Sequence, residues 1–262
     1  NAQDRLTANE CYRAAIEKEL GVPVKVFTPA DYDGVIQGLL GGTLDMAWLG
    51  ASAYAKIFLT DPAAVDVKLT TMHVNGSTGY YSIGFTRKDT GITSMEDAKG
   101  HTFAFGEPNS TSGYLVPAAE LIAKYGPLED YFSTVTFSGG HEQTIVGVAN
   151  GTFDAGVSWA DGVGDWADGY SSGGFRKATD AGLVDMNNLV EIWRSTMIPE
   201  GPMVVRSALP QDVKDKVTAL TANLPAVDMA CAEGVAGGEV KGFVPVDPAA
   251  YAGILEARKL QE

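Results

Sequence analysis

Two stretches of the sequence share one design and decide the fold. Residues 35–45 read VIQGLLGGTLD, and residues 144–154 read TIVGVANGTFD. At a constant offset of 109 residues, five of the eleven positions are identical: Ile36/Ile145, Gly38/Gly147, Gly42/Gly151, Thr43/Thr152 and Asp45/Asp154. Each copy predicts a helix that stops at glycine, followed by a strand that starts at aspartate. Such turns look alike in any α/β protein, but five identities favour two related units, separated by about one small domain.

Helical and strand patterns alternate on both sides of these stretches. The spacing predicts a helix capped at Thr7, a strand over 22–27, a helix capped by Asp31 or Asp33, a strand over 46–49 and a short helix after Ser94. Further strands are expected over 80–86, 101–105, 190–194 and 203–206, and a helix from 210 toward 224. We therefore expect an α/β protein of two lobes, each a mixed, mainly parallel sheet flanked by helices. Ligands bind beyond the carboxyl ends of parallel strands, so the expected site is a cleft between the lobes.

The charge balance restricts the class of protein. The 262 residues carry 19 Lys and Arg against 33 Asp and Glu, a net charge of −14. This balance argues against nucleic acid and against an anionic membrane surface as partners. Hydrophobic residues make up 45% of the chain, which is too many for a disordered protein. An anion could be bound only through local donors, because the overall field repels it.

The cysteines and the chain start leave alternatives open. Cys11 and Cys231 are either two buried thiols or one disulfide formed in an oxidising compartment. Two cysteines are too few for a disulfide-dense scaffold. The chain begins at Asn1 without a signal peptide or a start methionine, so we expect a processed or trimmed chain.

The run EPNSTSGY at 107–114 is the motif with the clearest chemistry. It follows the strand predicted over 101–105 and precedes a helical pattern. The first N–H groups of a helix have no ladder partner and carry partial positive charge, so they bind anions. Ser110, Thr111 and Ser112 add three neutral donors, whereas ordinary N-capping needs one hydroxyl. The motif predicts an oxyanion site without Lys or Arg nearby, although Pro117 is a mild conflict inside the predicted helix.

Other chemistry finds little support. There is no Gly-Lys-Ser/Thr phosphate loop, no dinucleotide fingerprint and no Gly-x-Ser-x-Gly elbow. His73, His101 and His141 do not have the spacing of metal ligands, so we expect neither a metal nor a cofactor. His141 lies at a second strand-to-helix turn, where it is either structural or a donor to the same anion.

The ends of the two repeated strands are expected to face the cleft. They nominate Trp48 and Leu49 in the first lobe and Trp159 and Asp161 in the second, with Ser158 beside them. The alternative for the aromatic residues is core packing. An aspartate beside aromatic rings suits a cationic group on a ligand.

Several of these segments together resemble the phosphonate-binding periplasmic proteins of ABC importers. The matching pieces occur in family order over most of the chain: residues 45–50, 79–82, 108–117, 140–142 and 198–202. The resemblance implies a two-lobed type II binding-protein fold, with residues 1–84 and 196–262 in the first lobe and 85–195 in the second. It implies that Ser110, Thr111, Ser112 and His141 hold a phosphonate group while Tyr80 lines the cleft. It also accounts for Pro117, which the family tolerates.

The chain departs from the family pattern around the expected amine pocket. Asp161 stands where a longer Glu is expected, Gly201 stands at an expected acid with Glu200 displaced by one, and Leu49 replaces a Tyr. The pocket is therefore expected to take an altered ligand, such as an N-methylated aminoalkylphosphonate or phosphite. A first strand found in the family is absent before Asn1, so we expect the mature chain to start earlier.

The sequence thus predicts a monomeric solute-binding protein that is either periplasmic or lipid-anchored. We expect it to close by a hinge near 83–87 and 194–198 and to deliver its ligand to an inner-membrane permease. We expect no enzyme activity. The alternatives are a binder of phosphite, phosphate or sulfate, a sensory binding module, and a phosphoester hydrolase with a serine from 110–112 as nucleophile.

Overall fold

The computed structural model describes residues 2–260, with side chains from residue 9 onward, and the chain divides into two compact units. Unit 1 comprises the described residues up to Thr78 together with Glu200–Glu256. Unit 2 comprises Gly79–Pro199 and the described residues from Ala257 onward. The units change at 78/79 and 199/200, whereas the lobe limits expected from the sequence lie at 84/85 and 195/196. Those expected limits of the two lobes remain a prediction.

Unit 1 packs helices around a four-stranded sheet. Its strands are β1 (Met46–Trp48), β2 (Val65–Met72), β9 (Pro202–Arg206) and β10 (Gly242–Pro245). Its helices are α1 (Ala2–Leu20), α2 (Tyr32–Leu40), α3 (Ala51–Thr60), α8 (Gln211–Val227) and α9 (Met229–Ala236). The 3₁₀ turn Pro248–Tyr251 leads into α10 (Ala252–Lys259), whose residues from Ala257 onward belong to unit 2. The predicted α/β class is confirmed in this unit.

The strand directions in unit 1 differ from the expected mainly parallel sheet. The order is β1-β9-β2-β10, and each neighbouring pair is antiparallel. β1 and β2 do run the same way, joined through α3, as a β-α-β unit requires. However, β9 returns from unit 2, inserts between them and runs in the opposite direction. Local patterns could not predict this insertion, because β9 pairs with strands that lie far from it along the chain.

A disulfide bond links two helices of unit 1. Cys11 of α1 is bonded to Cys231 of α9, so the disulfide alternative is the one found. Around it, Tyr12 and Ile16 of α1 pack with Leu69 of β2 and Val217 of α8 in one buried cluster. The disulfide therefore joins the N-terminal helix to a helix that lies near the other end of the sequence.

Unit 2 has helices on both faces of a mixed sheet. The sheet contains β3 (Gly79–Arg87), β4 (Thr102–Phe105), β5 (Thr134–Phe137), β6 (Ala155–Ala160), β7 (Leu189–Arg194) and β8 (Ile198–Pro199). Its order is β5-β4-β6-β3-β7, with β8 beside β3. β4 pairs in parallel with β5 and β6, while β3 pairs antiparallel with β6, β7 and β8.

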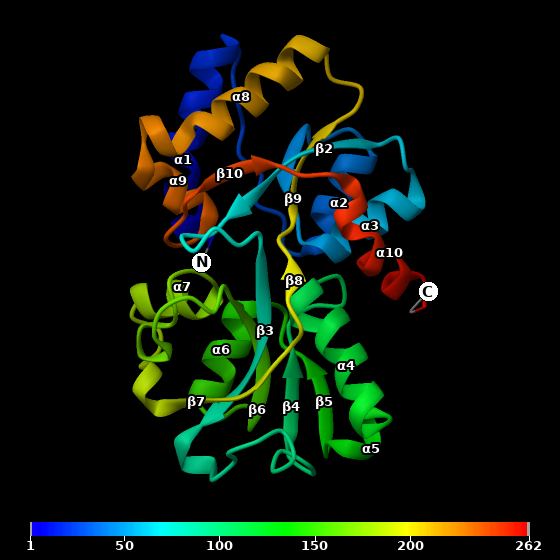
Figure 1. Cartoon of the computed structure of the whole chain (residues 1–262), viewed down its shortest axis with the longest axis vertical. Coiled ribbons are helices and arrows are strands. Elements are labelled where there is room, and N and C mark those ends of the chain that lie inside the picture. Colours follow the sequence, from blue (N-terminus) through cyan, green and yellow to red (C-terminus); the bar gives the residue numbers. More distant parts are fainter. Residues whose placement is uncertain (1, 261–262) are drawn as a thin grey trace. The chain divides into compact units, whose positions relative to one another are not determined.

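The helices of unit 2 make two separate cores. One face carries α4 (Val116–Tyr125) and α5 (Leu128–Tyr131), and the other carries α6 (His141–Ala149) and α7 (Gly174–Asp180), as Figure 1 shows. Phe103 and Leu121 lie in the first core, and Phe85 and Ile145 lie in the second. Shorter 3₁₀ turns cover Lys88–Thr90, Trp166–Asp168 and Met186–Asn188. Both faces of the sheet are thus covered by helices.

The repeated stretch forms the same turn in both units. A Cβ on Gly38 would lie 2.6 Å from Leu44 Cδ1, and one on Gly147 would lie 2.5 Å from Phe153 Cε2. The carbonyl of each of these glycines accepts from two backbone N–H groups five and six residues later. The predicted helix–glycine–strand repeat is therefore confirmed, and the matched glycine lets the side chain at the start of each strand lie against its helix.

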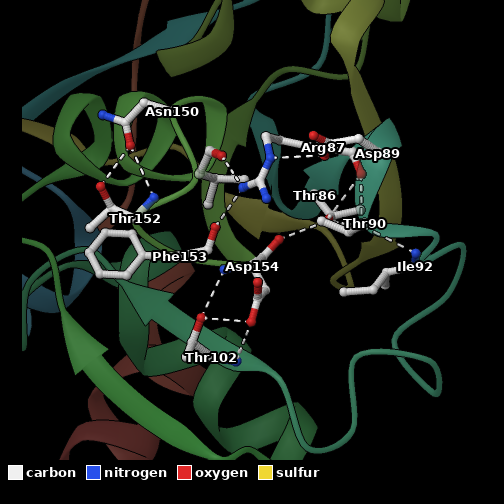
Figure 2. Close-up of polar contacts among 11 residues, drawn as sticks. Thr86, Arg87, Asp89, Thr90, Ile92, Thr102, Asn150, Thr152, Phe153 and Asp154 are labelled. Carbon is white, nitrogen blue, oxygen red and sulfur yellow. Dashed lines mark hydrogen bonds and ion pairs between the residues drawn. The ribbon is translucent and has the colours of Figure 1, made fainter.

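Polar side chains fasten the unit 2 copy of this turn (Figure 2). Arg87 Nη1 donates to the carbonyl oxygens of Val148 and Phe153 at 2.7 and 3.1 Å. Asp154 Oδ2 accepts from the backbone N–H and the hydroxyl of Thr102, each at 3.0 Å. These contacts hold the start of β6 at the end of the sheet opposite to its C-terminal site residues.

Three local predictions are wrong. The first helix already runs from Ala2, before the predicted cap Thr7, whose side chain lies outside the described residues. Residues 22–27 form no strand, and Val22 and Phe27 are 51% and 66% exposed. The backbone of Val24 bonds to the side chains of Glu17 and Arg13 of α1 instead of to another strand. Ser94 makes the predicted cap contact with the Asp97 N–H, but only turns follow it. The helix predicted with Asp31 as its cap is confirmed, because the carboxylate accepts from Gly34 N–H at 2.8 Å.

Candidate functional site

The Ser/Thr motif folds as one π-helical turn ahead of α4. Thr111–Leu115 form the turn, and Ser110 is its N-cap, with its hydroxyl accepting from Gly113 N–H at 3.0 Å. The first ladder bond joins Leu115 N–H to the Ser110 carbonyl at 3.0 Å. The N–H groups of residues 111–114 therefore precede the ladder, as expected of an anion-binding turn. Pro117 falls in the first turn of α4, where its missing N–H costs little, so its conflict with the helix disappears.

All three hydroxyl residues of the turn are buried. Ser110, Thr111 and Ser112 are only 1–2% exposed. Two hydrogen bonds from other segments stabilise the turn. Gly106 N–H donates to the Gly113 carbonyl at 2.9 Å, and Ser82 Oγ donates to the Ser112 carbonyl at 2.6 Å. Ordinary N-capping uses one hydroxyl, so three consecutive buried hydroxyl residues favour a role beyond capping.

The structure brings His141 to this turn. His141 opens α6, and its Nε2 lies 3.2 Å from Ser110 Oγ while its Nδ1 lies 3.2 Å from Ser158 Oγ. Gly113 makes room for the ring, because a Cβ there would lie 3.2 Å from His141 Cε1 and 2.7 Å from Ser110 Oγ. Burial and the nearby charge of Lys177 lower the pKa of His141 to about 4. The imidazole is therefore neutral at pH 7, with one nitrogen that donates and one that accepts.

A pair of aromatic rings lies next to His141. Tyr80 of β3 and Trp159 of β6 meet nearly perpendicularly, with ring centroids 5.6 Å apart, and Trp159 lies 6.4 Å from the His141 ring. The side chains are placed by pairing of the two strands, in which Ser82 stands opposite Trp159. Ser110, His141, Tyr80 and Trp159 thus form one continuous group within unit 2.

Asp161 is buried and engaged by its own loop. Its carboxylate accepts from the Ser171 hydroxyl and from the N–H groups of Val163 and Ser172, at 3.2 and 3.3 Å for the two N–H groups. Its own N–H donates to the Ser172 carbonyl at 3.1 Å. The Asp161 carboxylate therefore holds the loop after β6 in place. Its role toward a ligand cation stays a prediction.

Trp48 and Leu49 lie in unit 1. The Trp48 ring packs on Phe243 at 5.0 Å in the core, which favours the packing alternative for this residue. Leu49 N–H donates to the Pro202 carbonyl at 3.0 Å. A Cβ on Gly201 would overlap the Leu49 carbonyl oxygen, so this position excludes any side chain, acidic ones included. The displaced acid Glu200 instead pairs with the buried His73, at 2.9 Å.

Basic side chains do lie near the turn, contrary to the expectation. Arg258 of α10 donates from Nη2 to Asn109 Oδ1 at 2.7 Å, one residue before Ser110. Lys177 of α7 lies 5.7 Å from the centre of the Trp159 ring. Neither could be found from the motif, because Arg258 is 149 residues away and nothing in its surroundings marks it. Ser158 is nominated by the sequence at the end of the second repeated strand, and the structure places its hydroxyl next to His141. Ser82 lies in the matching segment 79–82, but the sequence assigns it no role in the site.

The arrangement suits binding better than bond cleavage. Ser110 and His141 are in contact, as a serine nucleophile and its base must be. However, the other ring nitrogen faces the Ser158 hydroxyl instead of a carboxylate, and a pKa of about 4 makes His141 a weak base. Within residues 2–260, no three His, Cys, Asp or Glu side chains gather in a way that could hold a metal ion. None of the helices in that range has the length and apolar character needed to cross a membrane.

Known proteins resemble this chain over most of its length. The chain is 34% identical to the phosphonates-binding periplasmic protein of Escherichia coli over 77% of its residues, although the match spans only 56% of that protein. It is 29% identical to a phosphate-import protein of Mycolicibacterium smegmatis, over 97% of this chain and 80% of the relative. A Pseudomonas aeruginosa structure, a binding protein component of an ABC phosphonate transporter, superimposes with a TM-score of 0.82 at 26% identity, covering 100% of this chain and 83% of that one.

These comparisons settle the family and the fold. The two-lobed type II fold that the sequence predicts is confirmed by the structural neighbours. The relatives are substrate-binding proteins and not enzymes, as expected. The family model for the periplasmic phosphonate substrate-binding proteins of ABC transporters matches residues 3–251, so the chain belongs to that family.

Proposed function

We propose that the chain binds a phosphonate-type oxyanion at the π-helical turn and serves as the substrate-binding component of an ABC importer. The observation that carries this proposal is the contact between Ser110 and His141, which joins the start of α6 to three consecutive buried hydroxyl residues. N–H groups, hydroxyls and one ring N–H converge there, and a tetrahedral oxyanion needs such a set of donors.

Neutral donors dominate this proposed site. His141 carries no charge at pH 7, so the anion is bound by N–H groups, hydroxyls and the helix dipole, with Lys177 and Arg258 behind them. This arrangement suits a chain of net charge −14, in which long-range attraction for anions is absent. Selection then depends on matching donors and acceptors to the oxygen atoms of the ligand.

A second ligand class has a specific observation in its favour. The relative whose match covers 97% of this chain is a phosphate-import protein, whereas the Escherichia coli relative binds phosphonates. Phosphate and phosphite share the tetrahedral oxyanion geometry but lack the carbon-linked tail. The π-helical turn is suited to all three ligands, so the residues around the tail decide between them.

The proposed tail pocket contains Tyr80, Trp159 and Asp161. The two rings offer aromatic faces, and the Asp161 carboxylate offers one negative charge near them. Such a group suits an amine or an N-methylated amine. Leu49 and Trp48 remain the proposed contribution of the first lobe, with a smaller role for Trp48 because its ring packs in the core. Gly201 offers no charge.

The remaining parts of the proposal concern transport. We infer hinge closure over the ligand, delivery to an inner-membrane permease, a periplasmic location and a monomeric state. The Cys11–Cys231 disulfide is consistent with an oxidising compartment. The periplasmic family supports the location and the permease.

A thermal-shift panel tests the proposal. The purified chain is heated with methylphosphonate, 2-aminoethylphosphonate, phosphite, phosphate or sulfate. A ligand present at about 100 times its Kd adds about 2.7 kcal/mol to the free energy of unfolding, which is a shift of several degrees. We expect a phosphonate to give the largest shift and sulfate none. A shift with phosphate alone favours the second ligand class, and no shift with any member contradicts the proposal.

A further inference from the structure

Three buried serines on separate segments of unit 2 form a continuous hydrogen-bonded path. Ser82 Oγ donates to the Ser112 carbonyl at 2.6 Å. Ser82 N–H donates to Ser195 Oγ at 3.0 Å, and Ser195 N–H donates to the Ser82 carbonyl at 2.9 Å. Ser82, Ser112 and Ser195 are 0%, 2% and 6% exposed. Since buried polar groups are strongly bound to their partners, this path fixes the three segments relative to one another.

The peptide group between Ser112 and Gly113 connects this path to the candidate site. Its carbonyl accepts from Ser82, and its N–H donates to Ser110 Oγ at 3.0 Å. The peptide is planar and rigid, so fixing its oxygen also fixes the direction of its N–H. Ser110 Oγ in turn contacts His141. Ser82 therefore sets the orientation of a peptide group in the turn without being part of it.

The path also reaches two of the three segments by which the chain passes between the units. Unit 2 begins at Gly79 and its main segment ends at Pro199. Ser82 lies on β3 shortly after the first limit, and Ser195 lies shortly before the second. A separate contact supports the second attachment, because Glu120 of α4 accepts from the hydroxyl and the N–H of Thr196 at 2.6 and 3.1 Å.

We propose that Ser82 is a positioning residue for the π-helical turn, and that Ser82 and Ser195 couple the conformation of this turn to the crossing segments near 79 and 199. The inference rests on the proposed function for its effect on affinity, but its structural part stands without a ligand. In this arrangement, an anion that orders residues 110–113 also orders residues 82 and 195. A change of conformation in the crossing segments alters the turn in return, as linkage requires.

The chain offers a matched control on the same strand. Thr86 of β3 is also fully buried, and its Oγ1 donates to the Asp154 carbonyl at 2.7 Å (Figure 2). Its acceptor belongs to the turn before β6, which carries no candidate site residue. Ser82→Ala and Thr86→Val each remove one buried hydroxyl that donates to a carbonyl, so both should lower the melting temperature by a similar amount.

Two readouts separate positioning from general stability. The first is hydrogen exchange without ligand, at the amides of Gly113, Leu115 and Ser195. We expect Ser82→Ala to raise exchange at all three sites by about tenfold relative to Thr86→Val, since each amide bonds along the path. The second is the Kd for methylphosphonate and for phosphate, which should rise about tenfold in Ser82→Ala and less than twofold in Thr86→Val.

The outcomes distinguish this inference from the proposed function. Equal exchange at residues 113, 115 and 195 in the two variants overturns the inference, whatever binds. Raised exchange in Ser82→Ala with no anion bound by the wild-type chain supports the path and contradicts the proposed function. If Ser82→Ala does not fold, Ser195→Ala is measured instead, and unchanged exchange at Gly113 in that variant overturns the coupling.

Discussion

His141 Nε2 lies 3.2 Å from Ser110 Oγ and joins the start of α6 to the turn before α4. The two residues are 31 positions apart, and each belongs to a strand-to-helix turn at the same edge of the unit 2 sheet. Parallel β4 and β5 bring these turns together, because the segments that follow adjacent parallel strands leave the sheet on the same edge. The contact therefore joins the two turns into one candidate site.

The pKa of His141 predicts a pH dependence of stability. Its folded-state pKa is about 4 against 6.5 for an ordinary histidine, so the unfolded chain binds more protons between these values. The neutral His141 therefore contributes fully to the free energy of unfolding above about pH 6.5. This contribution, up to about 3 kcal/mol, is lost as the pH falls toward 4. Urea unfolding of the wild type and of His141→Gln at pH 7.5 and 4.5 measures it. The wild type should lose more stability than the variant, and equal losses would rule out a buried neutral imidazole.

Gly201 predicts a large and local effect of one methyl group. A Cβ there overlaps the Leu49 carbonyl, so Gly201→Ala must displace backbone and should destabilise the chain by about 3 kcal/mol or more. Gly242 of β10 is the matched control, because a Cβ there meets nothing within 4 Å. Gly242→Ala should change the midpoint of urea unfolding little. Similar midpoints for the two variants would contradict the packing of Gly201 on Leu49.

Replacing Asp161 is expected to change the affinity for two ligands in different ways, depending on the role of its carboxylate. If its carboxylate meets a ligand cation, Asp161→Asn weakens binding of 2-aminoethylphosphonate by about 1–3 kcal/mol and leaves methylphosphonate unchanged. If its role is confined to the loop, where it accepts from Ser171 and Val163, both ligands lose affinity equally and the melting temperature falls. Calorimetric titration with both ligands decides between these roles. An equal loss removes Asp161 from the proposed tail pocket.

The disulfide predicts a stability change that leaves the oxyanion group intact. Cys11 and Cys231 are 220 residues apart in sequence, and they join α1 to α9 in unit 1. Replacing both with serine should lower the free energy of unfolding by about 2–5 kcal/mol, because a long loop regains its freedom in the unfolded chain. The π-helical turn, the proposed oxyanion site, lies in unit 2, so the affinity for the preferred ligand should stay within about twofold. A large loss of affinity at a temperature where the variant is folded would contradict this separation.

Local patterns in the sequence predicted more of the fold than the long-range arrangement. The glycine-ended helices, the Asp31 cap and the strand before the Ser/Thr turn depend on residues within about one turn of each other, and each is found. The direction of β9 could not be predicted, because it depends on which distant strand it pairs with. Residues 22–27 have a strand-like composition but no partner, and pattern alone does not supply one.

The candidate site shows the same division. Ser110, Thr111, Ser112 and His141 could be found because they lie at predicted strand-to-helix turns, and the resemblance added Tyr80. Arg258 and Lys177 were missed, since each comes from a distant segment and carries no motif. Ser82 lies in the matching segment 79–82, but its contact with the Ser112 carbonyl joins residues 30 positions apart and needs coordinates. The Gly201 position was noted as a departure from the family, but its physical reason, the approach of the Leu49 carbonyl, needs coordinates.

A calorimetric titration of the wild type and Thr111→Ala with methylphosphonate tests most directly whether the π-helical turn binds an oxyanion. Thr111 lies in the π-helical turn, 1% exposed, and its hydroxyl is proposed to donate to the anion. We predict one binding site in the wild type and an affinity loss of about 1–3 kcal/mol in the variant, with little change in melting temperature. Equal affinity in the two chains, or binding of no phosphonate, phosphite or phosphate by the wild type, would contradict the claim that this turn holds an oxyanion.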